Sequence, residues 1–179
     1  MIEPFAPSMG PPVAGALALI PGWMDTTNRG NFLSLPNARV QAGPFGLQIG
    51  NFCFIDPDTG IALNSNPGTP VFLAIAALLS MRYPVLYQSP GTPVVGPGGT
   101  VYQGAQVLMI GPGSTVYPFK KGYIWAPFPG GAIQGDPVYA DNTTGYPITG
   151  SAQPTNATET SFSVYTPCKP GGVAIITAN

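Results

Sequence analysis

The sequence predicts an all-β protein, a small β-barrel or sandwich built from short hairpins, with an extended N-terminal arm rich in proline and glycine. The chain of 179 residues is 44% hydrophobic and contains 24 glycines and 23 prolines, a composition typical of many short strands joined by tight turns. Several stretches alternate apolar and polar residues, and one Gly-Pro-Gly turn motif occurs twice. Disorder throughout the chain is not expected, because disordered chains lack apolar residues and carry high net charge.

Residues 1–37 form the predicted arm. Prolines and glycines are spread through it, and it has neither helical nor strand periodicity. Each large apolar side chain that becomes fully buried is worth about 1.5 to 3 kcal/mol, so we expect the arm to lie against its own body or against a neighbouring subunit. The large apolar side chains of this segment are Phe5, Leu17, Leu19, Ile20, Trp23, Phe32 and Leu33.

Residues 38–95 form the first predicted β subdomain. Residues 38–41 and 45–55 alternate with a period near two, which indicates strands with one buried face. A hairpin is expected at residues 56–60 (Asp-Pro-Asp-Thr-Gly), because proline sets one turn angle and glycine supplies the positive one. Residues 71–81 suit either a buried strand or a short helix, and their β neighbours favour a strand.

Residues 96–179 form the second predicted subdomain, a β-meander, and one continuous β domain over residues 38–179 is the alternative. The motif Gly-Pro-Gly-(Gly/Ser)-Thr-Val-Tyr occurs at residues 96–102 and again at 111–117, with an apolar strand expected between them. Further strands are expected at residues 121–126, 136–140, 162–165 and 173–176, and the turn at residues 141–145 (Asp-Asn-Thr-Thr-Gly) is similar to the one at residues 56–60.

Charged residues make up only 7% of the chain, six Lys and Arg against seven Asp and Glu, where about 25% is usual. Charge keeps protein surfaces soluble and apart, so we expect partners to cover much of this surface. The sequence has no basic stripe of the kind that binds nucleic acid. Its longest apolar stretch is shorter than the ~20 residues of a membrane helix. We therefore expect assembly with other proteins, no nucleic acid and no membrane.

The sequence offers little for catalysis or metal binding. It has no histidine, which removes the commonest general base and most zinc sites. Asp56 and Asp58 resemble the start of a calcium loop, but Pro67 stands where that loop needs a glutamate. The glycine-rich residues 96–99 lack the lysine of a phosphate-binding loop. We therefore expect no enzyme activity, no cofactor and no metal.

Cys53 and Cys168 are the two cysteines of the chain. A disulfide between them is one alternative, and two reduced thiols are the other. Residues 1–20 lack the basic start of a secretory signal, which favours reduced thiols.

Five residues are candidates for contacts with partners. Arg29 and Arg39 are two of three arginines in the chain, and arginine is enriched at interfaces, where its forked guanidinium makes fixed contacts. Ordinary surface charges are the alternative for this pair. Phe5, Trp23 and Phe32 are apolar anchors, and the backbone around them can add a strand to a neighbour.

Several motifs between residues 38 and about 150 resemble those of a known family. They are residues 39–44 (RVQAGP), residues 47–52 (LQIGNF) followed by Ile55-Asp56, residues 122–125 (GYIW), and residues 135–141 (GDPVYAD) followed by Gly145. In order and spacing they resemble the structural cement, or decoration, proteins of tailed-bacteriophage capsids. The chain departs from that pattern at residues 71–88, which are nearly uncharged where members of the family tend to carry charge.

The resemblance implies an all-β virion protein, assembled in the host cytoplasm, that binds the outside of the shell of major capsid protein and clamps neighbouring capsomers. Its implied partners are the major capsid protein and other copies of itself, as a dimer or a trimer. The second hypothesis is a head-fibre or tail-fibre component that binds a host-surface polysaccharide through exposed aromatic side chains such as Tyr117, Tyr123 and Trp125.

Overall fold

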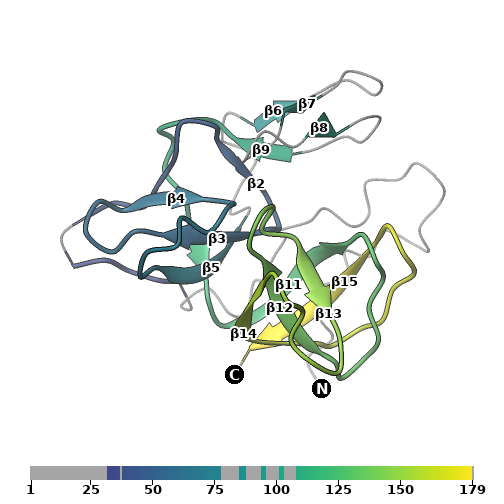
Figure 1. The fold of residues 1–179 in the computed structure, drawn as a ribbon. Coiled ribbons are helices and arrows are strands. Elements are labelled where there is room, and N and C mark those ends of the chain that lie inside the picture. Colours follow the sequence, from purple (N-terminus) through teal and green to yellow (C-terminus); the bar gives the residue numbers. More distant parts are fainter. Residues whose placement is uncertain are drawn as a thin grey trace.

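The protein is all-β, as the sequence predicts, in the computed structural model shown in Figure 1. The structure describes residues 32–36, 38–77 and 108–178, together with short strands at residues 85–87, 94–95 and 101–102. Every regular element within these residues is a β-strand. Most of the predicted arm, residues 1–31, lies outside the described part of the chain.

The first sheet has the strand order β1-β4-β3-β5-β10. The hairpin predicted around residues 56–60 is confirmed, because β3 and β4 pair antiparallel on either side of it. β5 confirms a strand over residues 72–76 of the expected 71–81, and residues 78–81 lie outside the described part of the chain. β1 runs parallel to β4, with Gln41 opposite Ile61. The strands are β1 (Gln41–Ala42), β3 (Phe52–Ile55), β4 (Ile61–Leu63), β5 (Phe72–Ala76) and β10 (Pro118–Phe119).

The second sheet is antiparallel and has the strand order β11-β15-β14-β12-β13. It contains the strands expected at residues 121–126, 136–140, 162–165 and 173–176. β11 and β15 pair over their whole lengths, from Gly122 opposite Ala178 to Phe128 opposite Gly172. The strands are β11 (Gly122–Phe128), β12 (Pro137–Asp141), β13 (Pro147–Thr149), β14 (Ala157–Val164) and β15 (Gly172–Ala178).

The remaining strands pair differently from the expected meander. β2 (Leu47–Gln48), β9 (Leu108–Ile110) and β6 (Val85–Tyr87) form a third sheet in the order β2-β9-β6, and β7 (Val94–Val95) pairs with β8 (Val101–Tyr102). Consecutive strands β8, β9 and β10 therefore belong to three different sheets. A turn sequence determines where the chain reverses direction, but it does not determine which strands pair with each other. β9 and β10 follow the expected subdomain boundary between residues 95 and 96, but they pair with strands that precede it.

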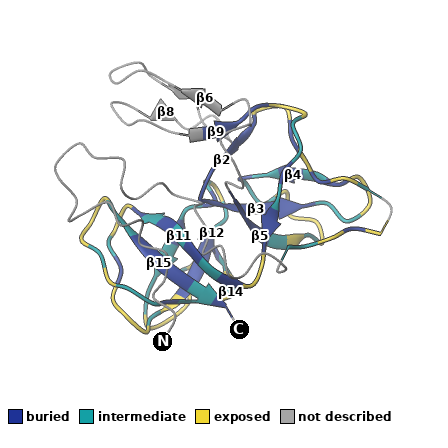
Figure 2. Ribbon diagram, turned by 180° about the vertical axis from the view of Figure 1, so that it is seen from behind, coloured by how far each residue is buried: buried dark blue, intermediate teal, exposed yellow. Residues whose placement is uncertain are grey.

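β3 in the first sheet is buried on both faces, which differs from the single buried face predicted for residues 45–55. In β3, Phe52 and Phe54 belong to one hydrophobic cluster, whereas Cys53 and Ile55 belong to a second. Successive strand residues point to opposite faces of a sheet, so β3 lies between the two clusters. Figure 2 shows β3 as a buried strand, whereas β5 begins with the exposed Phe72. A strand that is buried on both faces is apolar at every position, so its sequence does not indicate a solvent-facing side.

The first hydrophobic cluster fills the space between the first and second sheets. Side chains from both sheets meet in it: Phe52 and Phe162 contact edge to face, with ring centroids 5.8 Å apart. Phe119 of β10 is fully buried in the same cluster. The second sheet contributes Ile124, Ala126, Phe128, Val138, Ala140, Phe162, Val164, Ala174, Ile176 and Ala178.

Two turns share one hydrogen-bond pattern, as the similarity of residues 56–60 and 141–145 predicts. In each, the aspartate Oδ1 accepts backbone N–H groups two and three residues further on, and the glycine N–H donates to the aspartate carbonyl. Gly60 and Gly145 close the turns at φ of +73° and +70°, a region that favours glycine. The distances are Asp58 N–Asp56 Oδ1 2.8 Å, Thr59 N–Asp56 Oδ1 3.3 Å, Thr143 N–Asp141 Oδ1 2.9 Å, Thr144 N–Asp141 Oδ1 2.8 Å, Gly60 N–Asp56 O 2.9 Å and Gly145 N–Asp141 O 2.8 Å.

The second of these turns joins the two large sheets. The Phe52 N–H donates to the Gly145 carbonyl over 2.7 Å, so the start of β3 lies on the turn that follows β12. Beside it, the fully buried Asn64 accepts the Gln48 N–H through Oδ1 at 2.7 Å and donates from Nδ2 to the Phe52 carbonyl at 2.9 Å. The Phe52–Gly145 bond therefore links β3 to the second sheet, whereas Asn64, directly after β4, links β2 to β3.

Candidate interaction surface

Phe32 is one of two predicted interface residues that the structure describes, and it contacts its own body. Its ring meets Tyr117 and Phe119 edge to face, with centroids 6.2 Å and 5.8 Å apart. The next residue, Leu33, donates its N–H to the Pro118 carbonyl over 2.8 Å. Phe32 therefore attaches the end of the arm to β10. Phe5, Trp23 and Arg29 lie outside the described residues.

Arg39 is the other described candidate, and its side chain is exposed. Its backbone lies against the turn at residues 56–60. The Gln41 N–H, two residues later, donates to the Gly60 carbonyl over 2.9 Å. The Arg39 carbonyl lies so close to Gly60 that a Cβ at Gly60 would overlap it. The position of Arg39 is therefore set by the turn at residues 56–60, and its guanidinium is available to a partner.

An apolar surface that we call the outer face lies on the second sheet, opposite the core. Ile124, Ala126 and Phe128 of β11 point into the first cluster, so the alternate residues of this strand point outward. In β15 the outward positions opposite them are Val173, Ile175 and Thr177. We define the outer face as the apolar residues of these rows together with Tyr165, namely Tyr123, Trp125, Pro127, Tyr165, Val173 and Ile175; Thr177 is the polar residue at its edge.

The outer face differs from the usual solvent side of an antiparallel sheet, which is polar. Tyr123 and Tyr165 contact edge to face across it, with ring centroids 5.0 Å apart. Trp125 stands directly opposite Ile175 in the strand register. Ile175 is only 3% exposed, although it belongs to neither hydrophobic cluster. Trp125 and Tyr165 lie beside Ile175, and the other residues of the outer face are partly exposed.

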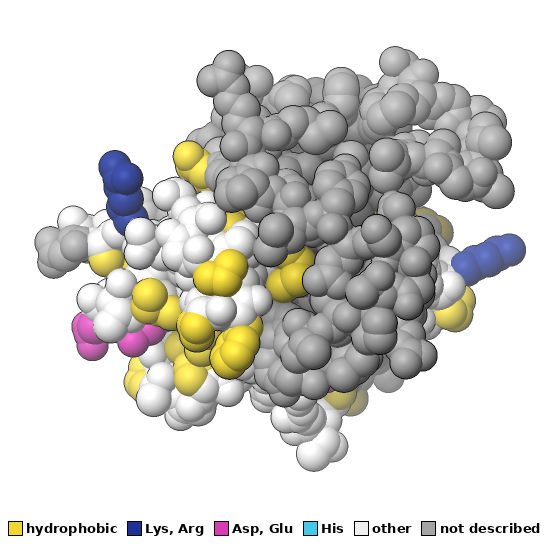
Figure 3. All heavy atoms as spheres, turned by 90° about the horizontal axis from the view of Figure 1, so that it is seen from above, with side chains coloured by type: hydrophobic (Ala, Val, Ile, Leu, Met, Phe, Trp, Pro, Cys, Tyr) yellow, Lys and Arg dark blue, Asp and Glu magenta, His cyan; other side chains and the backbone are white. Residues whose placement is uncertain are grey.

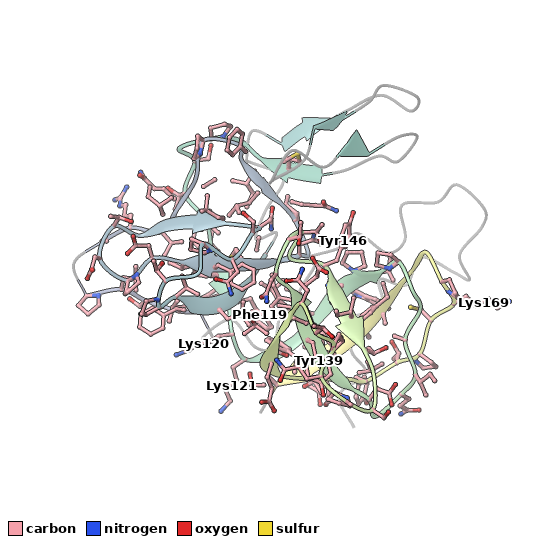
Figure 4. The ribbon with its side chains drawn as sticks, in the orientation of Figure 1. Phe119, Lys120, Lys121, Tyr139, Tyr146 and Lys169 are labelled. Carbon is pink, nitrogen blue, oxygen red and sulfur yellow. The ribbon has the colours of Figure 1, made fainter. Side chains whose placement is uncertain are left out.

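Charge in the described residues is concentrated in turns. Of nine charged side chains, only Asp141 and Glu159 belong to strands. Neither lies on β11 or β15, although Glu159, opposite Tyr139, is on the outward side of the same sheet. Figure 4 shows Lys120, Lys121 and Lys169 pointing away from the body. In Figure 3 hydrophobic side chains gather on the described part of the surface, and charged ones stand at its margins. The exposed faces of the strands are therefore nearly uncharged.

Three large hydrophobic side chains are exposed elsewhere on the described surface. Phe45 is 65% exposed between β1 and β2, Phe72 is 46% exposed at the start of β5, and Ile133 is 69% exposed between β11 and β12. Scattered apolar residues of this kind occur on most proteins. They add to the apolar surface without forming a site.

The titratable side chains give no sign of a reactive centre in the described residues. Cys53 and Cys168 are free thiols, in agreement with the reduced alternative. Burial raises the pKa of the Cys53 thiol to about 12 and also raises that of Cys168, so both favour the unreactive protonated form. The Asp58 N–H, followed by the Thr59 hydroxyl, lowers the pKa of Asp56. Within the same residues, no three potential metal ligands of the His, Cys, Asp or Glu type lie together.

Comparison with known proteins gives no match to a family model and none to a curated protein. Across the described ranges, no helix is long and apolar enough to cross a membrane.

Sequence reasoning identified Tyr123 and Trp125 but missed Tyr165, Val173 and Ile175 as parts of the same surface. The signal available was that residues 123–128 are apolar at odd and even positions alike, which indicates a strand covered on both sides. The partner residues on β15 depend on long-range pairing, and no local pattern contains that information.

Proposed function

We propose that this chain is a non-enzymatic cement, or decoration, protein of a tailed-bacteriophage capsid. It binds the outer surface of the major capsid protein shell and clamps neighbouring capsomers, together with other copies of itself. It assembles in the host cytoplasm and remains on the outside of the virion. The family resemblance of residues 38–150 supports this function.

The observation that carries the proposal is the placement of charge. In an isolated soluble protein, charged side chains cover the exposed strand faces and keep molecules apart. In the described residues of this chain, seven of nine charged side chains stand outside the strands. Uncharged strand faces suit a protein whose surface is covered by neighbours in an assembly.

A cement protein acts by burying surface across the joint between two capsomers, and it needs no catalytic activity to do so. Each apolar anchor that a neighbour buries contributes about 1.5 to 3 kcal/mol, and the symmetry of a shell repeats that contact at every equivalent joint. The arm supplies such anchors at Phe5 and Trp23, and the exposed Arg39 supplies a forked donor at the base of the arm.

Deleting residues 1–31 is expected to weaken binding to capsid shells by at least about tenfold, because losing one buried anchor alone removes about 1.5 kcal/mol or more. The deletion ends at residue 31 because Phe32 and Leu33 attach to β10 of the same chain. Co-sedimentation with shells that lack the protein measures this affinity.

The matched control is the full chain with Ser8→Ala, Thr26→Ser and Thr27→Ser, which keeps every apolar anchor and is expected to bind like the parent. Thermal unfolding of the shortened chain checks that its body is intact. Undiminished binding by an intact shortened chain would show that the arm is not the clamp.

Polysaccharide binding is the second candidate, and one observation favours it. Tyr123 and Trp125 are outward neighbours on β11, and Tyr165 packs beside Tyr123, so three aromatic rings share one side of the sheet. Sugar rings stack on such surfaces when they are open to solvent. A receptor-binding component occurs in few copies per particle, whereas a cement protein occurs at every joint, so copy number separates the two functions.

A further inference from the structure

Two buried amide side chains have carbonyl oxygens that no described residue supplies with a hydrogen-bond donor. Gln48 is 6% exposed and Asn51 is fully buried. Gln48 Oε1 and Asn51 Oδ1 are both enclosed, and neither accepts a hydrogen bond within the described part of the chain. Buried polar atoms are almost always paired with protein groups or with ordered water, because leaving them unpaired is costly. Both oxygens therefore require a donor.

Both side chains lie beside the turn that joins the two large sheets. Gln48 and Asn51 stand at the two ends of a tight turn between β2 and β3, in which the Asn51 N–H approaches the Gln48 carbonyl at 3.4 Å. Gln48 Nε2 donates to the Tyr146 hydroxyl over 2.9 Å, and Asn51 Nδ2 donates to the Thr144 carbonyl over 3.3 Å. The two amides thus reach the same short stretch of chain that follows β12.

Turning the amide groups over does not remove the need for a further partner. A turned Gln48 amide would set Oε1 against the Tyr146 hydroxyl, but it would put Nε2 in the enclosed position, where that nitrogen needs an acceptor. A turned Asn51 amide would set its oxygen against the Thr144 carbonyl, and two acceptors repel. The hydrogen bond to Thr144 therefore fixes which way the Asn51 oxygen points.

We propose that this joint binds internal water, which donates hydrogen bonds to Gln48 Oε1 and Asn51 Oδ1. One water molecule offers two donors, and folded proteins bind about one internal water per 27 residues at sites of this kind. The water adds a second link beside the direct Phe52–Gly145 bond between β3 and the turn. This site does not depend on the proposed function in a capsid.

A metal cation fits the site less well than water does. Calcium takes about six to eight oxygen ligands, usually with several carboxylates among them, whereas the two enclosed oxygens are neutral amides. The carboxylate of the turn is Asp141, and its Oδ1 already accepts the N–H groups of Thr143 and Thr144. Charge that would hold a cation is therefore directed into the turn itself.

A high-resolution crystal structure of the full chain, grown in rubidium chloride, tests the proposal without any variant. We expect ordered density about 2.5 to 3.0 Å from each amide oxygen, with no anomalous rubidium signal there. A rubidium peak at the site would overturn the proposal in favour of a cation. A backbone or side-chain donor of the protein at these oxygens, or enclosed oxygens with no density beside them, would overturn it as well.

Deuteron magnetic relaxation dispersion tests the same site in solution, because it counts water molecules that stay long inside the folded protein. Gln48→Met keeps the length of the side chain but removes Oε1. We expect it to lower the dispersion by the equivalent of at least one water, since a water that loses a bonded partner exchanges faster. Circular dichroism checks that the variant keeps its β structure.

Gln153→Met is the matched control. Gln153 is exposed, and its Nε2 donates to the Ala157 carbonyl over 2.7 Å, so this variant removes a glutamine and one hydrogen bond away from the enclosed oxygens. We expect it to leave the dispersion unchanged. Equal dispersion in the parent and in a folded Gln48→Met protein would overturn the binding of water by Gln48.

Discussion

Gly145→Ala is expected to lower the free energy of unfolding by about 4 kcal/mol, because it combines backbone strain with a steric clash. Gly145 has a φ of +70°, which costs an alanine about 1 to 2 kcal/mol. Its added Cβ would overlap the Phe52 carbonyl oxygen and stand 2.8 Å from the Asn64 carbonyl oxygen. The turn cannot retreat without breaking the 2.7 Å hydrogen bond from Phe52 to Gly145.

Gly113→Ala is the matched control, since Gly113 has nearly the same φ, +71°, but an added Cβ there meets nothing within 4 Å. We expect it to cost about 1 to 2 kcal/mol, the strain alone. Urea unfolding of both variants measures the difference, provided that the denaturant slope is unchanged. If the two substitutions cost the same, the close approach of β3 to the turn at residues 141–145 does not exist in solution.

Asn64→Leu is expected to destabilise the protein by about 4 kcal/mol, because it leaves two buried backbone groups unpaired at about 1 to 3 kcal/mol each. Asn64 is fully buried. Its Oδ1 accepts the Gln48 N–H at 2.7 Å, and its Nδ2 donates to the Phe52 carbonyl at 2.9 Å. Leucine has a similar size but can pair with neither group.

Asn156→Ala is the control for this effect, because the amide of Asn156 donates to Thr143 Oγ1 at the exposed surface over 2.9 Å. Water replaces that hydrogen bond, and we expect a change within about 0.5 kcal/mol. The measurement is again urea unfolding. If leucine at residue 64 is tolerated as well as alanine at residue 156, Asn64 does not hold β2 and β3 in place.

Local turn chemistry made much of the fold predictable. The similarity of residues 56–60 and 141–145 predicted two related turns, and both have the same aspartate hydrogen bonds and a glycine at positive φ. The information lies within five consecutive residues, so the sequence pattern suffices. The strands expected from apolar runs, such as β12 and β15, are confirmed for the same reason.

Strand pairing was not predictable, because it depends on residues far apart in the chain. The two related turns illustrate this. The Gly60 carbonyl accepts a hydrogen bond from the Gln41 N–H within the first sheet, whereas the Gly145 carbonyl accepts one from the Phe52 N–H of the other large sheet. Nothing in either pentapeptide distinguishes these partners. Likewise, the apolar residues of β3 indicate a strand buried on both faces, but they do not show which residues form the cluster on each side.

The candidate site was predictable only in part. Its aromatic members on β11 stand out in the sequence, but Val173 and Ile175 join them through the pairing of β11 with β15. Phe32 was expected to be an anchor, and the structure places its ring on Tyr117 and Phe119 of the same chain. Its predicted contact with a partner stays a prediction, as do those of Phe5, Trp23 and Arg29.

The most direct test of the cement function is an electron cryomicroscopy map of the assembled virion that contains this chain. The proposed function predicts that the two large sheets appear on the outside of the shell, across joints between capsomers, in copies as numerous as those joints. Density for the chain that is confined to a tail or to a few fibres would contradict the cement function and favour binding of a host-surface polysaccharide.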